Sequence, residues 1–168
     1  MWRVLAVEND RALLITDKLI DYVKYNESYT NVTWEICTLR KWMNTDFISK
    51  TFSSSQQAQI ATVSNQNPNN PKYGTKGGNA TQDRIFALSI DEAEKYFSSD
   101  SDRKAYTTDY AHKRGYDLKD RSEYWWLRSP GNDSSRAAYV GGSGSIGQGG
   151  DYVDRSVVAV RPAFWLNL

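Results

Sequence analysis

The chain has 168 residues, of which 39% are hydrophobic and 13% aromatic, and it carries 21 Lys and Arg against 20 Asp and Glu. A chain of this length buries most of what its unfolded form exposes, so we expect a single domain over residues 1–168. The formal net charge of +1 gives no strong field for nucleic acid or an anionic membrane, and we expect no nucleic-acid partner.

Cysteine and histidine are too scarce for a disulfide framework or a zinc site. One Cys, Cys37, and one His exclude an internal disulfide and give no set of zinc ligands, so we expect no metal and no cofactor. No apolar run approaches the roughly 18 residues of a membrane span, and we expect no membrane insertion. Residues 1–4 enter a strand pattern directly, which is not typical of a signal peptide.

The N-terminal part is predicted to form a β-hairpin. Residues 2–6 and 12–16 are apolar, β-leaning runs that flank the turn residues 8–11, and this pattern is typical of a hairpin. Residues 17–32 are polar and rich in tyrosine. We expect them to form an irregular segment that crosses the molecule.

Short helices are predicted next. Residues 31–35 can cap a helix that continues to residue 43, with its apolar residues on one face. Residues 44–46 should break this helix, and a second short helix should end near Phe52. Residues 53–60 have the pattern of a cap followed by one or two helical turns. A short strand over residues 60–64 should follow.

The middle of the chain alternates loops with short elements. Residues 65–82 contain two prolines and many Asn, Gly and Thr, which predicts a long exposed loop. Residues 84–88 are mostly apolar and predict a strand, and residues 89–97 begin with a capping box that predicts a helix. Residues 98–106 are expected to be a polar loop. Residues 107–115 predict a helix that starts at Thr107 or Thr108 and ends at a glycine.

The last quarter of the chain contains two predicted buried strands. Residues 124–130 and 157–166 are apolar and aromatic, each around one arginine. An unpaired buried charge is costly, so each guanidinium should find carboxylate or carbonyl partners. The expected scaffold residues are Trp125, Trp126, Arg128 and Arg161. Together the elements predict an α+β fold with short helices and long loops, in which the N-terminal and C-terminal strands join in one sheet.

Residues 131–156, between these strands, have a distinct composition. They hold seven of the eleven glycines, and Tyr, Ser, Asn, Asp and Arg fill most other positions. This alphabet is similar to that of antibody loops, where Tyr gives rigid contact area and Ser, Gly and Asn give adaptable hydrogen bonds. Val140, Ile146 and Val153 recur at intervals that a flexible linker has no reason to keep. The segment is either a ligand-contact surface or a Gly/Ser-rich turn region without a special role.

Six motifs lie along the chain: WRVLAV at 2–7, TWE at 33–35, TLRKWMN at 38–44, IFALS at 85–89, WWLRSPG at 125–131 and VRPA at 160–163. Together they resemble a family of gut-bacterial and phage domains that often serve as the variable proteins of diversity-generating retroelements. The resemblance covers nearly the whole chain. Its most specific part is the pair WWLRSPG and VRPA.

The resemblance implies a C-type-lectin-like fold, distantly similar to formylglycine-generating enzymes. In such proteins a reverse transcriptase rewrites adenine-rich codons near the C-terminus, and the altered side chains form a binding surface on a constant scaffold. An AAC-type codon altered only at its adenines never encodes Lys, Glu, Gln, Met or Trp, and residues 131–156 obey this except at Gln148. The implied partner is an unknown protein or glycan on a host-cell surface, and the implied location is a phage virion or a bacterial cell surface.

On this interpretation, apolar anchors stay fixed and buried while the positions between them vary and are exposed. The expected anchors are Ala137, Ala138, Val140, Ile146 and Val153, with Gly144 and Gly150 allowing turns. The expected variable, ligand-binding positions are Asn132, Asp133, Ser134, Ser135, Arg136, Tyr139, Gly141, Gly142, Ser143, Ser145, Gly147, Gly149, Asp151, Tyr152, Asp154, Arg155 and Ser156.

An enzyme is the second functional class. Chemistry of the formylglycine-generating type needs two reactive cysteines, and the chain has only Cys37. With a single His there is no Ser/His/Asp triad, and the Gly/Ser run at 141–145 lacks the lysine and the following helix of a phosphate loop. We therefore expect no enzymatic activity.

Two further alternatives are non-catalytic. A calcium-dependent carbohydrate-binding lectin would use a Pro flanked by oxygen ligands and a Trp-Asn-Asp triplet, of which residues 66–69 are only a loose echo. Asp133, Asp151 and Asp154 could gather a cation, although scattered aspartates are more often solvated. The other alternative is a non-diversified structural domain of a bacterial surface protein.

Overall fold

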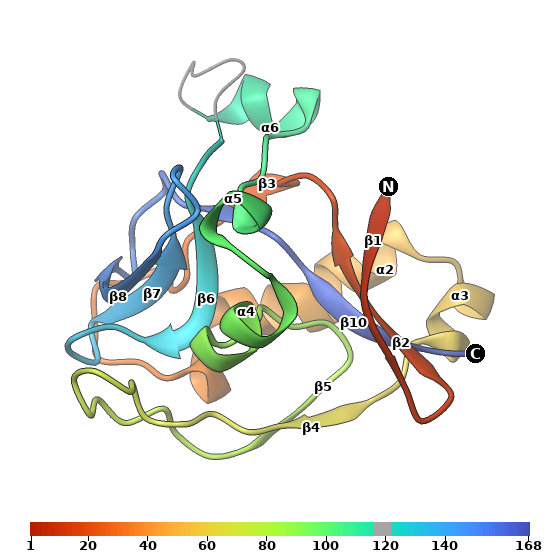
Figure 1. Cartoon of the computed structure of the whole chain (residues 1–168), viewed down its shortest axis with the longest axis horizontal. Helices are drawn as coiled ribbons and strands as arrows, with labels where there is room; N and C mark the ends of the chain where they lie inside the picture. Colours follow the sequence, from red (N-terminus) through yellow and green to blue (C-terminus); the bar gives the residue numbers. More distant parts are fainter. Residues whose placement is uncertain (116–121) are drawn as a thin grey trace.

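The computed structural model describes residues 1–115 and 122–168, which adopt an α+β fold of short helices and several sheets (Figure 1). One three-stranded sheet has the order β1–β2–β10, a five-stranded sheet has the order β3–β9–β6–β7–β8, and β4 pairs with β5. The strands are β1 (Trp2–Glu8), β2 (Arg11–Thr16), β3 (Asp21–Tyr22), β4 (Val63–Asn65), β5 (Thr81–Asp83), β6 (Trp125–Pro130), β7 (Arg136–Val140), β8 (Ile146–Tyr152), β9 (Ala159–Val160) and β10 (Ala163–Asn167).

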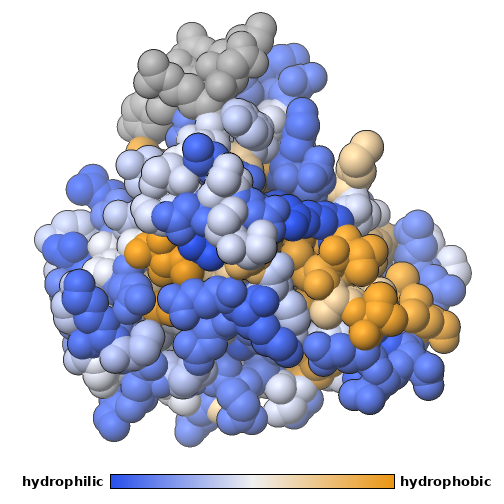
Figure 2. All heavy atoms as spheres, in the orientation of Figure 1, coloured by the Kyte–Doolittle hydropathy of each residue, from blue (hydrophilic) through white to orange (hydrophobic). Residues whose placement is uncertain are grey.

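The N-terminal hairpin is confirmed, and so is its union with the C-terminal strand. Asn9 and Asp10 have φ values of 49° and 57°, the left-handed backbone that a tight two-residue hairpin turn requires. Strand β2 pairs antiparallel with β1 on one side and with β10 on the other. Val4 and Val7 of β1 are exposed, and hydrophobic residues gather at the hairpin end of the face shown in Figure 2.

The predicted strand over residues 157–166 is wrong as a single element. It divides into β9, which pairs with β3 and β6, and β10, which pairs with β2 in the other sheet. The division falls at Arg161 and Pro162, where proline has no N–H to give to a ladder. The carbonyl of Pro162 accepts from the N–H of Thr16 (3.0 Å), so the chain joins the first sheet immediately afterwards.

The predicted continuous helix over residues 31–43 is also wrong. A 3₁₀ turn, η1 (Trp34–Ile36), is followed by extended Cys37, whose sulfur accepts from the N–H of Arg40 and so caps the next helix. The predicted break at 44–46 is also wrong, since the backbone stays helical from residue 38 to residue 51. The parts of this helical run are α1 (Thr38–Trp42), the π-type turn η2 (Met43–Phe47) and α2 (Ile48–Thr51).

Three predicted caps are confirmed. Ser53 and Ser89 form capping boxes, and the Thr108 side chain accepts from the N–H of Ala111. The corresponding helices are α3 (Ser54–Gln59), α4 (Ile90–Tyr96) and α6 (Asp109–Arg114). Two neighbouring predictions are wrong. Residues 84–88 are not a strand and make one isolated bridge, Phe86 to Ala163, and the expected polar loop 98–106 contains helix α5 (Asp100–Arg103).

The core surrounds the predicted tryptophan scaffold. Trp34, Trp125 and Trp126 are fully buried, and each indole N–H has a partner: Asp83, the carbonyl of Arg103 and the carbonyl of Val23, respectively. A buried indole needs such a partner because its N–H would otherwise be desolvated without compensation. Within residues 1–115 and 122–168, no helix has the length and apolar character needed to cross a membrane.

Candidate ligand-contact surface

Residues 131–156 form the β7–β8 hairpin and its flanking loops. The expected anchors Ala137, Ala138, Val140 and Val153 are completely buried, and Ile146 is half-buried against the core. These side chains fix the backbone of the segment from beneath. The polar positions between them therefore lie on a surface whose backbone is fixed, and the segment is not a flexible linker.

The two expected turn glycines have the backbone that glycine permits. Gly144 has a φ of +88° and Gly150 a φ of +74°, a region that other residues adopt at a cost. A Cβ on Gly144 would lie 1.7 Å from the carbonyl oxygen of Asp100, and one on Gly150 would lie 2.7 Å from that of Ala137. Both positions therefore exclude side chains.

Most of the expected variable positions are at least partly exposed, with two exceptions. Ser135 is buried because its hydroxyl donates to Asp133 (2.6 Å) and its carbonyl accepts from Val153 (3.0 Å). Gly141 is buried beside Ser145, to whose carbonyl it donates. The expected exposure of these two is wrong. Exposed are Asn132, Asp133, Ser143, Ser145, Arg155 and Ser156, and partly exposed are Ser134, Arg136, Tyr139, Gly142, Gly147, Gly149, Asp151, Tyr152 and Asp154.

The glycines of the surface differ in how much space they leave for a side chain. A Cβ on Gly142 would lie 2.7 Å from the carbonyl oxygen of Ser122, and one on Gly147 would lie 2.5 Å from the ring of Tyr139. At Gly141 and Gly149 the nearest atoms would be 3.6 Å away, an ordinary contact. Substitution is therefore easier at Gly141 and Gly149 than at Gly142 and Gly147.

Tyr152 is the centre of a cluster of aromatic and cationic side chains. The guanidinium of Arg136 lies 4.1 Å from the centre of its ring and that of Arg155 lies 5.7 Å away. Tyr29 packs edge-on against the same ring at 5.4 Å. We call these four residues, Tyr29, Arg136, Tyr152 and Arg155, the Tyr152 cluster. Tyrosine and arginine are the residue types enriched at binding hot spots.

Tyr29 is the member that sequence reasoning missed. It comes from the irregular segment 17–32, which backbone hydrogen bonds hold beside the hairpin: Asn26 donates to Val153 (2.7 Å) and Val32 to Ser134 (2.8 Å). The high tyrosine content of that segment was the one sequence signal that could have linked it to a contact surface. Its pairing with residues over 100 positions away could not be found from local pattern.

Two carboxylates balance the arginines of the cluster. Asp133 lies 3.4 Å from Arg136, and Asp151 lies 3.5 Å from Arg155. Beside them is a hollow of about 480 Å³, lined mostly by polar residues that include Tyr29, Tyr152, Asp154 and Arg155. Partly exposed ion pairs of this kind are worth little in stability. Their charged groups are available to a partner that offers complementary charges.

Tyr139 has a different environment from Tyr152. It pairs across the hairpin with Gly147 and its ring covers that glycine, while Tyr124 packs on it at 5.3 Å. Burial raises the pKa of Tyr139, and the neighbouring Tyr124 and Asp151 raise it further. Tyr139 is therefore held mainly by cross-strand packing, whereas Tyr152 contacts the cationic side chains of its cluster.

The loop 65–82 supports the β7–β8 hairpin. The sequence predicts that this loop is exposed, but part of it is buried. Asn70 is buried, and its amide nitrogen donates to the carbonyls of Pro130 (2.8 Å) and Gln148 (2.9 Å). Its amide oxygen accepts from the N–H groups of Lys72 and Tyr73. One side chain thus connects the loop to the end of β6 and the middle of β8.

The two scaffold arginines have the polar partners that the sequence predicts. Arg128 forms a bidentate ion pair with Glu92 and donates to the carbonyls of Ala87 (3.0 Å) and Gln66 (3.1 Å). Arg161 donates to the carbonyls of Thr16, Arg103 and Asp17 and lies between the rings of Phe97 and Trp125. Burial lowers the pKa of Arg161 to about 10.

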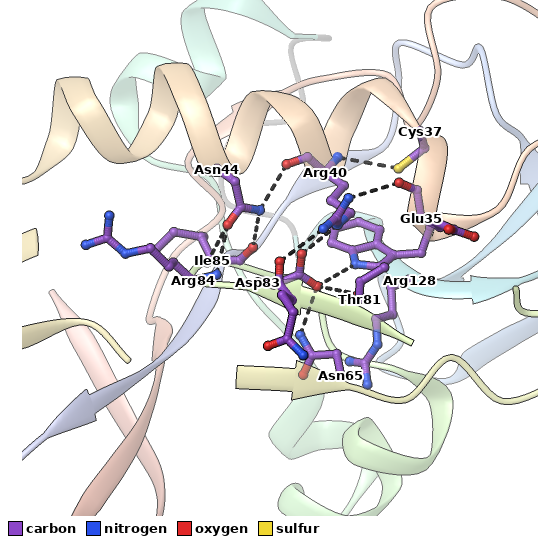
Figure 3. A network of polar contacts seen from close by, with 12 residues as sticks. Glu35, Cys37, Arg40, Asn44, Asn65, Thr81, Asp83, Arg84, Ile85 and Arg128 are labelled. Carbon is purple, nitrogen blue, oxygen red and sulfur yellow. Dashed lines mark hydrogen bonds and ion pairs between the residues drawn. The ribbon is translucent and has the colours of Figure 1, made fainter. Parts of the chain in front are cut away.

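A buried network around Asp83 was not predicted from the sequence (Figure 3). Its carboxylate accepts from Trp34 (3.1 Å), Asn65 (3.0 Å) and Thr81 (2.7 Å) and pairs with Arg40 at 2.6 Å. The network joins α1 to the β4–β5 pair from which loop 65–82 extends. It holds the base of that loop in place.

Nothing in the described part of the chain gathers cation ligands. Within residues 1–115 and 122–168 no group of three or more His, Cys, Asp or Glu side chains could hold a metal ion. Asp133 and Asp151 instead pair with arginines of the Tyr152 cluster.

The family model described as a domain of unknown function, DUF6273, matches residues 9–168. The chain belongs to the DUF6273 family. The DUF6273 match begins in the turn of the N-terminal hairpin and therefore includes β2, β10 and the whole candidate surface. No curated protein and no solved structure matches the chain.

Proposed function

We propose that the chain is a ligand-binding protein and that the surface of residues 131–156, with Tyr29, makes the contact. The Tyr152 cluster carries this proposal. It places Tyr29, Tyr152 and Arg155 at one hollow of about 480 Å³, with Arg136 stacked on the Tyr152 ring, on a backbone fixed by buried anchors. A protein or glycan partner fits this chemistry, because tyrosine faces and guanidinium groups contact both apolar and hydrogen-bonding surfaces.

We propose further that a retroelement diversifies this surface. The support is the separation of roles along the segment: buried apolar anchors alternate with polar positions that are mostly accessible. Space is limited at Gly142 and Gly147, and Ser135 is buried. Diversification would therefore concentrate on the more accessible positions, which are Asn132, Asp133, Arg136, Ser143, Ser145, Gly149, Tyr152, Arg155 and Ser156.

The proposed scaffold is a C-type-lectin-like fold. Its support is the union of the N-terminal and C-terminal strands in one sheet, with the candidate hairpin in a second sheet and long irregular connections between them. This arrangement leaves a surface that can change without changing the closing strands.

Binding is favoured over catalysis by the state of the single cysteine. Cys37 is buried, and burial raises the pKa of its thiol to about 12, although the N–H groups of Arg40 and Leu39 oppose the shift. Because the thiolate is the nucleophile, such a thiol is inert at neutral pH. Chemistry of the formylglycine-generating type has no support here.

One titration distinguishes a calcium-dependent lectin from the proposed binding protein. Calorimetry with CaCl₂ should give no saturable heat, because Asp133 and Asp151 already have cationic partners. Saturable heat at micromolar affinity would favour the lectin function over the proposed one.

The diversification proposal is tested at the gene. The locus should carry a near-repeat of the segment encoding residues 131–156, with adenines at the variable codons, next to a reverse-transcriptase gene. A locus without any such repeat would remove diversification from the proposal and leave a non-diversified binding or structural domain.

The binding proposal is tested with arrays of glycans and of host-cell surface proteins. We expect reproducible binding that a Tyr152→Ala/Arg155→Ala variant loses. Tyr106→Ala/Arg11→Ala serves as the matched control, since both residues are exposed and lie outside the surface. Equal binding by the Tyr152→Ala/Arg155→Ala variant and the natural chain would contradict the proposed site.

A further inference from the structure

A cavity of about 590 Å³ opens between the N-terminal hairpin, the helical run from α1 to α2, and helix α6. None of its lining residues belongs to the Tyr152 cluster or its hollow. The volume falls in the range of small-molecule sites, roughly 300 to 1,000 Å³. The candidate contact surface does not account for this cavity.

Aromatic rings form part of the cavity wall. Trp2, Trp42 and Phe47 line it, and the rings of Trp42 and Phe47 are 5.4 Å apart. Phe52 connects this pair to Trp2, with ring separations of 6.1 Å to Phe47 and 5.8 Å to Trp2. Rings that contact one another hold each other in place, so the walls present fixed, flat apolar faces.

The charged side chains at the cavity are balanced in sign. Asp46 lies 3.5 Å from Lys50, and Asp21 lies 3.0 Å from Arg114, which does not itself line the cavity. Asp17 and Lys18, which also line the cavity, are adjacent in the sequence and opposite in charge. With Arg114 included, three acidic and three basic side chains lie at the cavity, and this balance favours a neutral occupant.

One wall residue has an unused polar group. Thr16 is buried, and within the described residues its hydroxyl oxygen has no hydrogen-bond partner. An unpartnered buried hydroxyl costs free energy that a partner would recover. Rotation about the Cα–Cβ bond by one rotamer moves the hydroxyl to the position that the methyl group now has, which allows the hydroxyl to turn toward an occupant.

We propose that this cavity binds a neutral, flat aromatic molecule that carries one hydrogen-bonding group. The aromatic body lies against Trp2, Trp42 and Phe47, and the polar group pairs with the hydroxyl of Thr16. This site is separate from the proposed contact surface. Its failure would leave the proposed function untouched, and the reverse also holds.

The test is calorimetric titration of the full chain with 1-naphthol. We expect saturable binding of one molecule per chain. Thr51→Trp places a bulky ring at the cavity and should weaken binding at least tenfold. Ser49→Trp is the matched control, because Ser49 is also exposed on α2 but does not line the cavity, and it should bind as the natural chain does. Lys50→Trp is a second filling variant if Thr51→Trp does not fold.

The polar group is tested by Thr16→Val with two probes. Binding of 1-naphthol should weaken several-fold, whereas binding of naphthalene, which has no hydroxyl, should stay unchanged. Absence of saturable 1-naphthol binding, or equal effects of the filling and control variants, would overturn the site. Equal weakening of both probes by Thr16→Val would overturn the role of the hydroxyl.

Discussion

Arg161 is a buried cation without a carboxylate partner among the described residues. Three backbone carbonyls and two aromatic faces take the place of a counter-ion. A planar guanidinium can donate to all three carbonyls at once, whereas an ammonium on a flexible stem cannot. The residue therefore belongs to the core, even though its side chain is charged.

Arg161→Lys should destabilise the fold by about 2 to 4 kcal/mol, since carbonyls would lose their donors and a lysine in this site would be poorly solvated. Urea unfolding followed by circular dichroism measures the change. Arg11→Lys, at an exposed position, is the control and should change stability by less than about 0.5 kcal/mol. An unchanged melting temperature for Arg161→Lys would contradict the scaffold role.

Asp83 has a comparable place in the polar part of the core. Asp83→Ala should cost about 3 kcal/mol, because Trp34, Asn65, Thr81 and Arg40 would lose their acceptor together. Urea unfolding again measures the loss. Asp46→Ala removes an exposed ion pair with Lys50 and should cost less than about 1 kcal/mol. Similar losses in the two variants would show that the network does not stabilise the fold as a unit.

At the scale of elements, strand β8 contains neighbouring glycines of which one can accept a side chain and the other cannot. Gly149→Ala should change stability by less than about 1 kcal/mol, because its Cβ meets only the hydroxyl of Tyr73 at 3.6 Å. Gly150→Ala should cost about 2 kcal/mol or more, because its φ of +74° and the nearby carbonyl of Ala137 both oppose a side chain. Thermal unfolding of the two variants measures the difference. Equal tolerance at both positions would contradict the distinction between anchors and variable positions.

Local sequence signals predicted the helix starts well because a cap acts within three residues. Ser53, Ser89 and Thr108 each accept from the backbone N–H three positions ahead. The predicted break at 44–46 is wrong because the side-chain amide of Asn44 forms most of its hydrogen bonds with another segment of the chain and does not end the helix. Its amide donates to the carbonyls of Arg40 and Ile85 and accepts from the N–H groups of Arg84 and Ile85. A partner 40 positions away cannot be found from propensity.

The candidate surface was predictable in part for the same reason. The buried anchors follow from the spacing of apolar residues within the segment, and their burial is confirmed for Ala137, Ala138, Val140 and Val153. Tyr29 and Asn70 reach the surface from distant segments. Their contributions depend on tertiary packing, which produces neither a regular spacing of residues nor a motif in the sequence.

At the scale of the whole molecule, Arg161 and Pro162 connect the two larger sheets. Strand β9 ends at Val160 in one sheet and β10 begins at Ala163 in the other. Between them, Arg161 donates to the carbonyl of Thr16, at the end of β2, and to that of Arg103. The same Arg103 carbonyl accepts from the indole of Trp125 in β6. Unfolding of either sheet would therefore break the hydrogen bonds that Arg161 and the Arg103 carbonyl form between the two sheets.

This coupling predicts that the chain unfolds as one cooperative unit. Tryptophan fluorescence reports on all six tryptophans, among them Trp125 and Trp126 in the five-stranded sheet, and pulsed thiol labelling reports on buried Cys37 at the start of α1. The two transitions in urea should share one midpoint, and labelling should be negligible before it, because burial raises the pKa of the Cys37 thiol to about 12. Labelling of Cys37 well below the fluorescence midpoint would mean that the surroundings of Cys37 open before the tryptophan environments are lost, which would contradict a single cooperative unit.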